Sequence, residues 1–122
     1  MTEALIVDDN RQTADALHQM LEVLGLPSRV AYGSSPAISI LGSGFTPSLI
    51  CLDVNMPGVD GIEILLYLRR EPRLVKIPVI VITSDDQPET RRKVMSGGAT
   101  ALIIKPATID SLEQALKNAN LL

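Results

Sequence analysis

The sequence predicts an α/β fold in which a doubly wound, five-stranded parallel sheet is covered by helices on both faces. The first observation behind this is a series of short, uninterrupted apolar runs, which are typical of strands buried on both faces of a parallel sheet. The second is that a stretch with helical spacing of apolar residues follows each run after a short link. Strand and helix therefore alternate along the whole chain.

The first half of the chain begins with a strand over residues 4–7 and a helix from residue 11 to residue 25. Apolar residues recur at helical spacing in that helix, and glycine commonly follows a helix end. Pro27 blocks continuation of the helix, and residues 29–32 are predicted as a second strand nearer the sheet edge. A short helix over residues 35–41 follows, with serine as its N-cap and proline at its first position.

The second half repeats the pattern with a strand over residues 49–52 and a helix over about residues 60–70. The most β-prone stretch covers residues 79–82, and a helix over residues 88–96 follows it. The last predicted strand covers residues 101–104. The final helix is expected to pack one apolar face on the sheet, formed by Ile109, Leu112, Leu116 and Ala119.

Right-handed crossovers leave few ways to arrange these strands, and the expected one is the flavodoxin-like (βα)5 order 2-1-3-4-5. At 122 residues the chain is predicted to be a single domain over residues 1–122. In the helix over residues 60–70, the core face is assigned to Ile62, Leu65 and Leu68. The remaining apolar residues of that helix form either a partner or dimer patch or an ordinary buried edge: Ile64, Leu66 and Tyr67.

Composition argues against nucleic acids and membranes as partners. The net charge is -3 and aromatic residues make up 2% of the chain, whereas nucleic-acid binders use basic patches and aromatic stacking platforms. The basic run at residues 91–93 is interpreted as a solvated helix face, and His18 is expected to face solvent. Cys51 is the only cysteine, so an intrachain disulfide is excluded and core packing is expected. With no signal peptide pattern and no apolar run of about 20 residues, a cytoplasmic location is expected.

Charged or hydroxyl-bearing side chains follow several of the predicted strands at the point where each strand ends. Asp8 and Asp9 follow the first strand, Asp53 the third, Thr83 the fourth and Lys105 the fifth. Because ligands of open parallel sheets bind at the carboxyl ends of the strands, these groups are expected to meet in one site.

The predicted strand order gives this site a chemical character. Three crowded carboxylates repel each other unless a cation lies among them, and an all-oxygen donor set favours Mg²⁺. Thr83 and Lys105 are expected on the far flank of Asp53, away from the acidic pair. A dianionic group on Asp53 would then be held by metal on one side and by hydroxyl and ammonium on the other, which is a layout for phosphoryl transfer.

With these residues in view, the chain resembles the receiver domains of two-component response regulators, in the CheY-like superfamily. The resemblance runs from residue 4 to about residue 120 and depends on a combination of motifs. They are the acidic pair Asp8-Asp9, the stretch from Asp53 to Gly61, the Thr83-Ser84 step and the Lys105-Pro106 pair.

The resemblance implies a role for each residue of the acidic cluster. Asp53 would accept a phosphoryl group from a phosphohistidine on a sensor histidine kinase or a histidine phosphotransfer protein. Asp9, Asp53 and the backbone carbonyl of Asn55 would bind Mg²⁺ directly, and Asp8 would act mostly through a metal-bound water. Such a domain catalyses its own phosphorylation and autodephosphorylation without being a metabolic enzyme, and switches contacts with a downstream protein.

The resemblance also implies roles for the other residues of the site. Lys105 would pair with the phosphate and Thr83 would move its hydroxyl onto a phosphate oxygen, with Ser84 and Pro106 in support. The Lys105-Pro106 peptide bond would be cis. Asn55 and Asp85 match positions that influence how fast the acyl phosphate hydrolyses.

One position departs from the family pattern. Receiver domains usually carry an aromatic residue three places before the lysine, whereas this chain has Leu102 there, so the usual output switch is in question. This keeps open an alternative function as an interaction module that works without phosphorylation. A third possibility is a phosphatase of the haloacid dehalogenase type, which would need a second aspartate where Asn55 stands.

Overall fold

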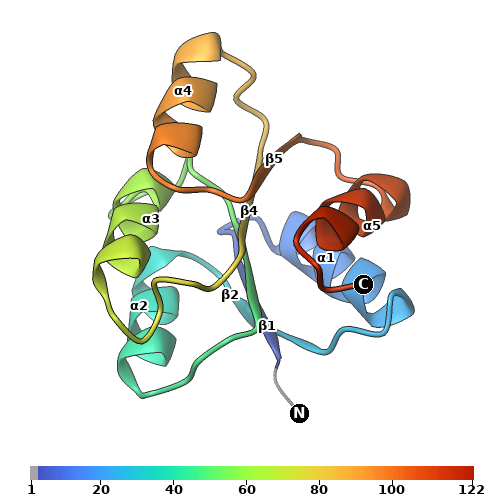
Figure 1. Ribbon diagram of the computed structural model, residues 1–122, viewed down its shortest axis with the longest axis horizontal. Coiled ribbons are helices and arrows are strands. Elements are labelled where there is room, and N and C mark those ends of the chain that lie inside the picture. Colours follow the sequence, from blue (N-terminus) through green and yellow to red (C-terminus); the bar gives the residue numbers. More distant parts are fainter. Residues whose placement is uncertain (1–2) are drawn as a thin grey trace.

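The computed structural model describes residues 3–122 and has a central sheet of five parallel strands (Figure 1). The strand order is β2-β1-β3-β4-β5, with every neighbouring pair parallel. The predicted fold and strand order are therefore confirmed. The strands are β1 Ala4–Val7, β2 Ser28–Ala31, β3 Leu49–Leu52, β4 Val79–Thr83 and β5 Ala101–Ile104.

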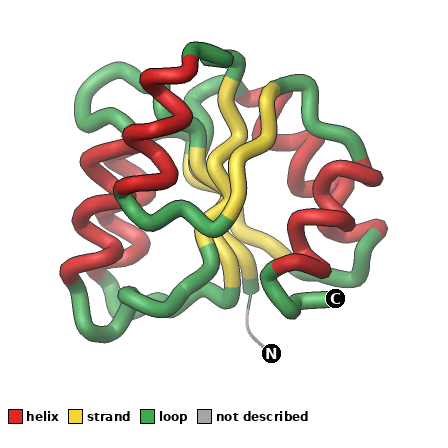
Figure 2. The backbone as a smooth tube through the Cα atoms, turned by 45° about the horizontal axis from the view of Figure 1, so that its top comes forward, coloured by secondary structure: helices red, strands yellow, loops and turns green. Residues whose placement is uncertain are grey.

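Five helices cover the two faces of this sheet. Figure 1 shows α1 and α5 on one side and α2, α3 and α4 on the other, and Figure 2 shows the sheet between these layers. This is the arrangement that right-handed crossovers produce in a doubly wound sheet. The helices are α1 Arg11–Val23, α2 Ser34–Gly42, α3 Gly61–Arg70, α4 Pro88–Ser96 and α5 Ile109–Asn118.

Each strand sends alternate side chains to the two faces, so the sheet separates two apolar cores. In β1, Leu5 and Val7 join the core under α2, α3 and α4, whereas Ala4 and Ile6 join the core under α1 and α5. All residues of β1, β3 and β4 are buried, as continuous apolar runs predict. The buried central strands form a rigid base for the residues that follow them.

The peripheral elements differ from the predictions in burial. Strand β5 is only partly buried along its length, because it is the last strand of the sheet and pairs with β4 alone. On α3 the core residues include Ile64, while Ile62 is only partly buried. On α5, Ile109 is 41% exposed, so the buried face is instead Leu112, Ala115 and Leu116.

Several predicted boundaries shift as well, and α1 ends at Val23, two residues earlier than expected. The second strand is Ser28–Ala31, one residue earlier than expected. The predicted N-cap of α2 was wrong: the helix begins at Ser34 after Gly33, whose φ of 121° lets the chain turn directly into the helix. Pro36 then lies within the first helical turn, where backbone N–H groups have no partner inside the helix.

Three smaller expectations can also be compared with the structure. His18 is partly buried instead of facing solvent, with its Nδ1 atom 2.6 Å from the Ser28 hydroxyl. The basic run at residues 91–93 is exposed on α4, as predicted, and Lys93 pairs with Glu89 at 3.5 Å. Within residues 3–122, every helix is too short or too polar to cross a membrane.

Candidate functional site

The acidic groups are brought together by the pairing of β1 with its two neighbours. The backbone N–H of Asp53 donates to the carbonyl of Val7 at 3.0 Å, and that of Asp8 donates to Ala31 at 3.2 Å. These bonds extend the parallel ladders one residue beyond the strands. As a result, the residues after β1 and β3 leave the sheet side by side at its carboxyl edge.

Asp8, Asp9 and Asp53 each place a carboxylate oxygen within 4.8 Å of the others. Asp8 and Asp53 are buried, with 1% and 6% of their surface exposed, while Asp9 is exposed. One oxygen of Asp8, Oδ1, accepts the backbone N–H of Asn10 at 2.9 Å and so helps to start α1. The predicted cluster of three carboxylates is therefore present and open to solvent on the Asp9 side.

Lys105 lies differently from the prediction, which put it only on the far flank of Asp53. Its Nζ atom is 2.9 Å from Asp8 Oδ2 and 3.4 Å from Asp53 Oδ2, so it bridges both buried carboxylates. The long side chain starts from the end of β5, where the Lys105 N–H donates to the Thr83 carbonyl at 2.8 Å. Four methylene groups are enough to cross the end of β4, a reach that strand order alone does not reveal.

Burial and charge act in opposite directions on these groups. Burial raises the pKa of Asp53, and the charge of Asp8 adds to this, while Lys105 and the Asn55 N–H partly offset it. Burial lowers the pKa of Lys105, but its close contacts with the carboxylates of Asp8 and Asp53 outweigh that effect and raise the pKa overall. The lysine is therefore a fixed cation beside a carboxylate that is poorly solvated.

Thr83 lies at the end of β4 and is fully buried. Its hydroxyl oxygen accepts the backbone N–H of Asp85 at 3.2 Å, which fixes the start of the loop into α4. Asp85 in turn accepts hydrogen bonds from the Gln87 N–H at 3.0 Å and the Thr90 hydroxyl at 2.7 Å. These bonds, the one from Thr90 first, lower the pKa of Asp85, while Ser84 between the two residues is exposed.

The loop after Asp53 is held by two contacts that the sequence analysis did not assign. The Asn55 N–H donates to Asp53 Oδ1 at 3.2 Å, which orients the carboxylate. Gly61, the first residue of α3, packs so closely on the Asp53 backbone that a Cβ atom there would lie 2.2 Å from its carbonyl oxygen. A glycine directly after a helix N-cap, Asp60, is the sequence signal that could have indicated this close approach.

Ser34 is a second residue that the sequence analysis missed. It is buried at the start of α2, and its hydroxyl donates to the Pro57 carbonyl at 3.4 Å. The Ser34 Oγ atom also lies 3.4 Å from where a Cβ on Gly58 would stand, and Gly58 has a φ of 83°. The start of α2 therefore packs against the loop between Asp53 and α3.

The acidic cluster suits a hard metal ion. Its candidate ligands are carboxylate oxygens, the donors that Mg²⁺ prefers. Asp8 Oδ2 is buried, and among the described residues its charged partner is the Lys105 ammonium at 2.9 Å. A buried oxygen with spare acceptor capacity beside two further carboxylates can receive a cation.

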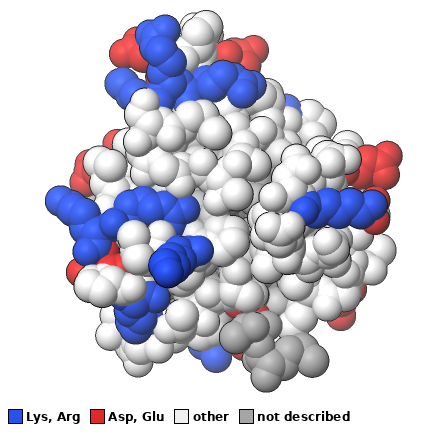
Figure 3. Space-filling model, in the orientation of Figure 1, with Lys and Arg blue, Asp and Glu red and all other residues white. Residues whose placement is uncertain are grey.

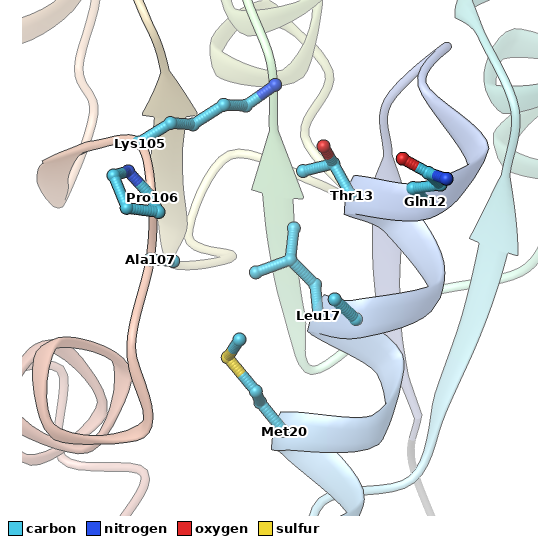
Figure 4. Close-up of a pocket in the computed structure, with 8 residues that line it drawn as sticks. Gln12, Thr13, Leu17, Met20, Lys105, Pro106 and Ala107 are labelled. Atoms are coloured by element: carbon cyan, nitrogen blue, oxygen red, sulfur yellow. The ribbon is translucent and has the colours of Figure 1, made fainter.

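A cavity of about 420 Å³ adjoins this site between α1 and the segment that follows β5 (Figure 4). Lys105, Pro106 and Ala107 line one side, and Figure 4 shows Leu17 and Met20 of α1 facing them. The Lys105-Pro106 bond is cis, as the resemblance implied. The cavity is a mostly apolar surface next to the charged groups.

Comparison with known proteins identifies the family. The profile described as "Response regulator receiver domain" matches residues 4–117. The chain belongs to this family. The sequence of this receiver domain is 31% identical over 112 residues to that of a two-component response regulator of Oryza sativa subsp. japonica. The alignment covers 92% of this chain and 93% of the relative.

Solved receiver domains have the same fold. The signal receiver domain of a DNA-binding response regulator from Colwellia psychrerythraea 34H is 27% identical, with a TM-score of 0.90 and full coverage of both chains. The signal receiver domain of a histidine kinase from Syntrophus aciditrophicus is 32% identical, with a TM-score of 0.86, covering 98% of this chain and 89% of that one.

In the present receiver domain, Leu102 is partly buried and packs against the core under α3 and α4.

Proposed function

We propose that Asp53 of this receiver domain is the phosphoacceptor and takes a phosphoryl group from a phosphohistidine of a sensor histidine kinase or a histidine phosphotransfer protein. The observation that carries this proposal is the position of Asp53, a buried carboxylate 3.4 Å from the Lys105 ammonium and beside the carboxylates of Asp8 and Asp9. A carboxylate of that kind can act as a nucleophile, and the lysine can hold the transferred group. Asp9 is exposed and lies too far from Lys105 to form an ion pair with it, so Asp9 is a weaker candidate for the acceptor.

In the proposed reaction a carboxylate oxygen of Asp53 attacks phosphorus while the bond between phosphorus and the imidazole nitrogen breaks. The leaving imidazole nitrogen takes up a proton, and Asp53 becomes an acyl phosphate. Lys105 neutralises charge on the phosphoryl oxygens, and the Asn55 N–H keeps the carboxylate oriented for attack. Such positioning and charge neutralisation supply most of the catalysis in phosphoryl transfer.

Mg²⁺ is the proposed cofactor. Asp9, Asp53 and the backbone carbonyl of Asn55 would hold the ion, and Asp8 would act mostly through a metal-bound water. When bound, the ion supplies positive charge against the phosphoryl oxygens and relieves repulsion among the carboxylates. The carboxylate oxygens of Asp8, Asp9 and Asp53, which all lie within 4.8 Å of one another, support this assignment.

The other residues of the site are proposed to transmit the phosphorylated state and to influence how long it lasts. The Thr83 hydroxyl would exchange the Asp85 N–H for a phosphate oxygen, with Ser84 and Pro106 supporting the phosphate, and this would loosen the start of α4. Asn55 and Asp85 would influence hydrolysis of the acyl phosphate from the rim of the site. Leu102 has no hydroxyl to switch between environments, so we expect the signal to leave through the loop after Thr83.

We infer a single receiver domain over residues 1–122 that acts in the cytoplasm with a kinase or phosphotransfer partner and an unidentified downstream protein. The cavity beside Lys105 supports a phosphodonor that packs its apolar side chains on α1 while its histidine reaches Asp53. Leu102 favours a second candidate, an interaction module that works without phosphate. A phosphatase of the haloacid dehalogenase type has less support, since Asn55 occupies the position of its second aspartate.

Incubation with acetyl phosphate and Mg²⁺, followed by intact-mass spectrometry, tests the proposal. We expect one added phosphate on the wild-type protein and none on Asp53→Asn. Asp15→Asn is a matched control, because Asp15 is an exposed acid on α1 whose carboxylate accepts only the Tyr32 hydroxyl among the described residues. A wild-type protein that stays unmodified would favour the phosphate-independent module.

A further inference from the structure

A groove of about 360 Å³ runs between α2 and α3, away from the charged site. Its exposed apolar residues are Leu66 on α3, 44% exposed, and Ile38 on α2, 42% exposed. Val59 and Tyr67 are partly buried beside them. Large aliphatic side chains that lie together on an exposed surface are typical of contacts with another protein.

The two ends of this groove carry opposite charges on the same helix. Glu63 in the first turn and Arg70 in the last turn are both exposed, and within residues 3–122 neither forms a salt bridge. The neighbouring Arg69, by contrast, uses its guanidinium within the domain and donates to the carbonyls of Gly98, Val75 and Ile77. The charge of Arg70 is therefore available to a partner.

The spacing of these residues makes the surface complementary to itself. Glu63 and Arg70 are seven residues apart, which is about 10.5 Å along a helix, and Leu66 and Tyr67 lie midway between them. If a second copy packs its α3 antiparallel to the first, each Glu63 faces Arg70 of the other copy. The apolar residues then meet at the centre, and both ion pairs form at once.

We propose that this α3 surface, formed by Glu63, Leu66, Tyr67 and Arg70 with Ile38 and Val59 at its edge, mediates a homodimer with twofold symmetry. A twofold interface uses the same patch on both subunits, and the charge pattern of α3 meets that requirement. Within α3, Glu63, Leu66 and Arg70 are separated by three and four residues, which suits packing at a shallow crossing angle.

The charge pattern also decides the direction of packing. The last turn of α3 carries two bases, Arg69 and Arg70. Figure 3 shows Lys and Arg side chains on the left, where α3 lies in Figure 1, as well as at the top over α4. Parallel pairing of two α3 helices would place these basic C-terminal turns against each other, whereas antiparallel pairing places Arg70 against Glu63. Since like charges that face each other oppose association, only the antiparallel arrangement is compatible with the surface.

The dimer is expected to be weak. One short helix with the flank of α2 is a small surface beside the roughly 1,200–2,000 Å² that stable interfaces bury, so we expect association only at high protein concentration. Phosphorylation of Asp53 should not require it, because Glu63 and Arg70 lie outside the acidic site.

Sedimentation equilibrium from micromolar to millimolar concentration tests this proposal with charge reversals. Glu63→Arg leaves the surface with two bases and Arg70→Glu leaves it with two acids, so each variant alone should dimerise at least about tenfold more weakly than the wild type. An equimolar mixture of the two variants should form heterodimers with about wild-type affinity, because each base then faces an acid. The double variant should likewise recover homodimers.

The mixture also separates a lost interface from a lost fold, since misfolded variants could not restore each other. Lys117→Glu is the control, because Lys117 is exposed on α5, on the opposite face of the sheet. We expect its dimerisation to match that of the wild type. A wild-type protein that remains monomeric at millimolar concentration would overturn the proposal, as would a dimer insensitive to both reversals or a mixture that stays monomeric.

Discussion

Gly61 provides a sensitive test of how α3 positions the phosphoacceptor. In Gly61→Ala, the new Cβ atom would stand 2.2 Å from the Asp53 carbonyl oxygen and 2.6 Å from the Val54 Cα atom. Cβ atoms in proteins essentially never approach other heavy atoms closer than 3.0 Å, so the backbones must separate by roughly 0.8 Å or more. Both contacts are backbone atoms of the loop that carries the nucleophile, and neither can rotate away.

Two effects follow from that displacement. Overpacking of this kind costs about 1–3 kcal/mol of unfolding free energy, which would lower Tm by about 5–15 °C in a domain of this size. Misplacement of a reacting group by about 1 Å can slow a reaction on the order of a hundredfold. We therefore expect Gly61→Ala to take up phosphate from acetyl phosphate at least about tenfold more slowly than the wild type. This figure is smaller than the roughly hundredfold effect because the loop can relax part of the displacement.

Gly42→Ala is the matched control for this experiment. Gly42 is the last residue of α2, and a Cβ atom there would meet no heavy atom within 4 Å. Since alanine is favoured over glycine in a helix, Gly42→Ala should melt at or slightly above the wild-type temperature and be phosphorylated at the wild-type rate. If Gly61→Ala behaved like Gly42→Ala in both melting and phosphorylation rate, the reasoning from close packing would be refuted.

Four further outcomes follow, three from the site and one from the buried core. Mg²⁺ should raise Tm, by the equivalent of about 2.7 kcal/mol at a hundred times its Kd, and an unchanged melting curve would contradict the cation site. Burial raises the pKa of Asp53 in the folded protein, so the ionised carboxylate destabilises the fold at pH values above that folded pKa. Asp53→Asn should therefore melt at a higher temperature than the wild type at neutral pH without metal. That difference should shrink as the pH falls through the folded pKa, and a constant difference would count against it. Because Lys105 lowers the pKa of Asp53, carbon NMR titration of the Asp53 carboxyl should give a higher pKa in Lys105→Met, and a lower or equal value would be inconsistent with the ion pair. Burial raises the pKa of Cys51 to about 12, so at pH 8 only about one thiol in ten thousand is ionised, and a thiol reagent should modify it only after unfolding; rapid labelling of the native protein would exclude this burial.

The central strands were predictable because their burial comes from local sequence. A run such as that in β3, with every residue apolar, has only one stable position in a sheet that helices cover on both sides. Strand β5 has a similar composition but lies at the sheet edge, and only the strand order reveals its partial exposure. The predicted first residue of α2 was wrong because Gly33 adopts a positive φ, which cannot be predicted from the sequence around it.

The site was predictable to the extent that strand ends determine it. Asp8, Asp9 and Asp53 follow adjacent strands and were correctly expected to meet. Lys105 was misplaced because its position depends on the path of a long flexible side chain, which bridges Asp8 and Asp53 instead of flanking one of them. The close packing of Gly61 on the Asp53 backbone was not predicted, because its one sequence signal is a glycine directly after the N-cap Asp60, and that signal does not say which backbone the glycine meets.

The central claim is that this chain carries its phosphoryl group on Asp53. The most direct test is to phosphorylate the protein with acetyl phosphate and Mg²⁺, reduce the acyl phosphate with borohydride and map the peptides by mass spectrometry. Reduction converts a phosphorylated aspartate to homoserine, so we predict homoserine at position 53 and intact aspartate at positions 8 and 9. Homoserine at either of those two positions, or at none of the three, would contradict the claim.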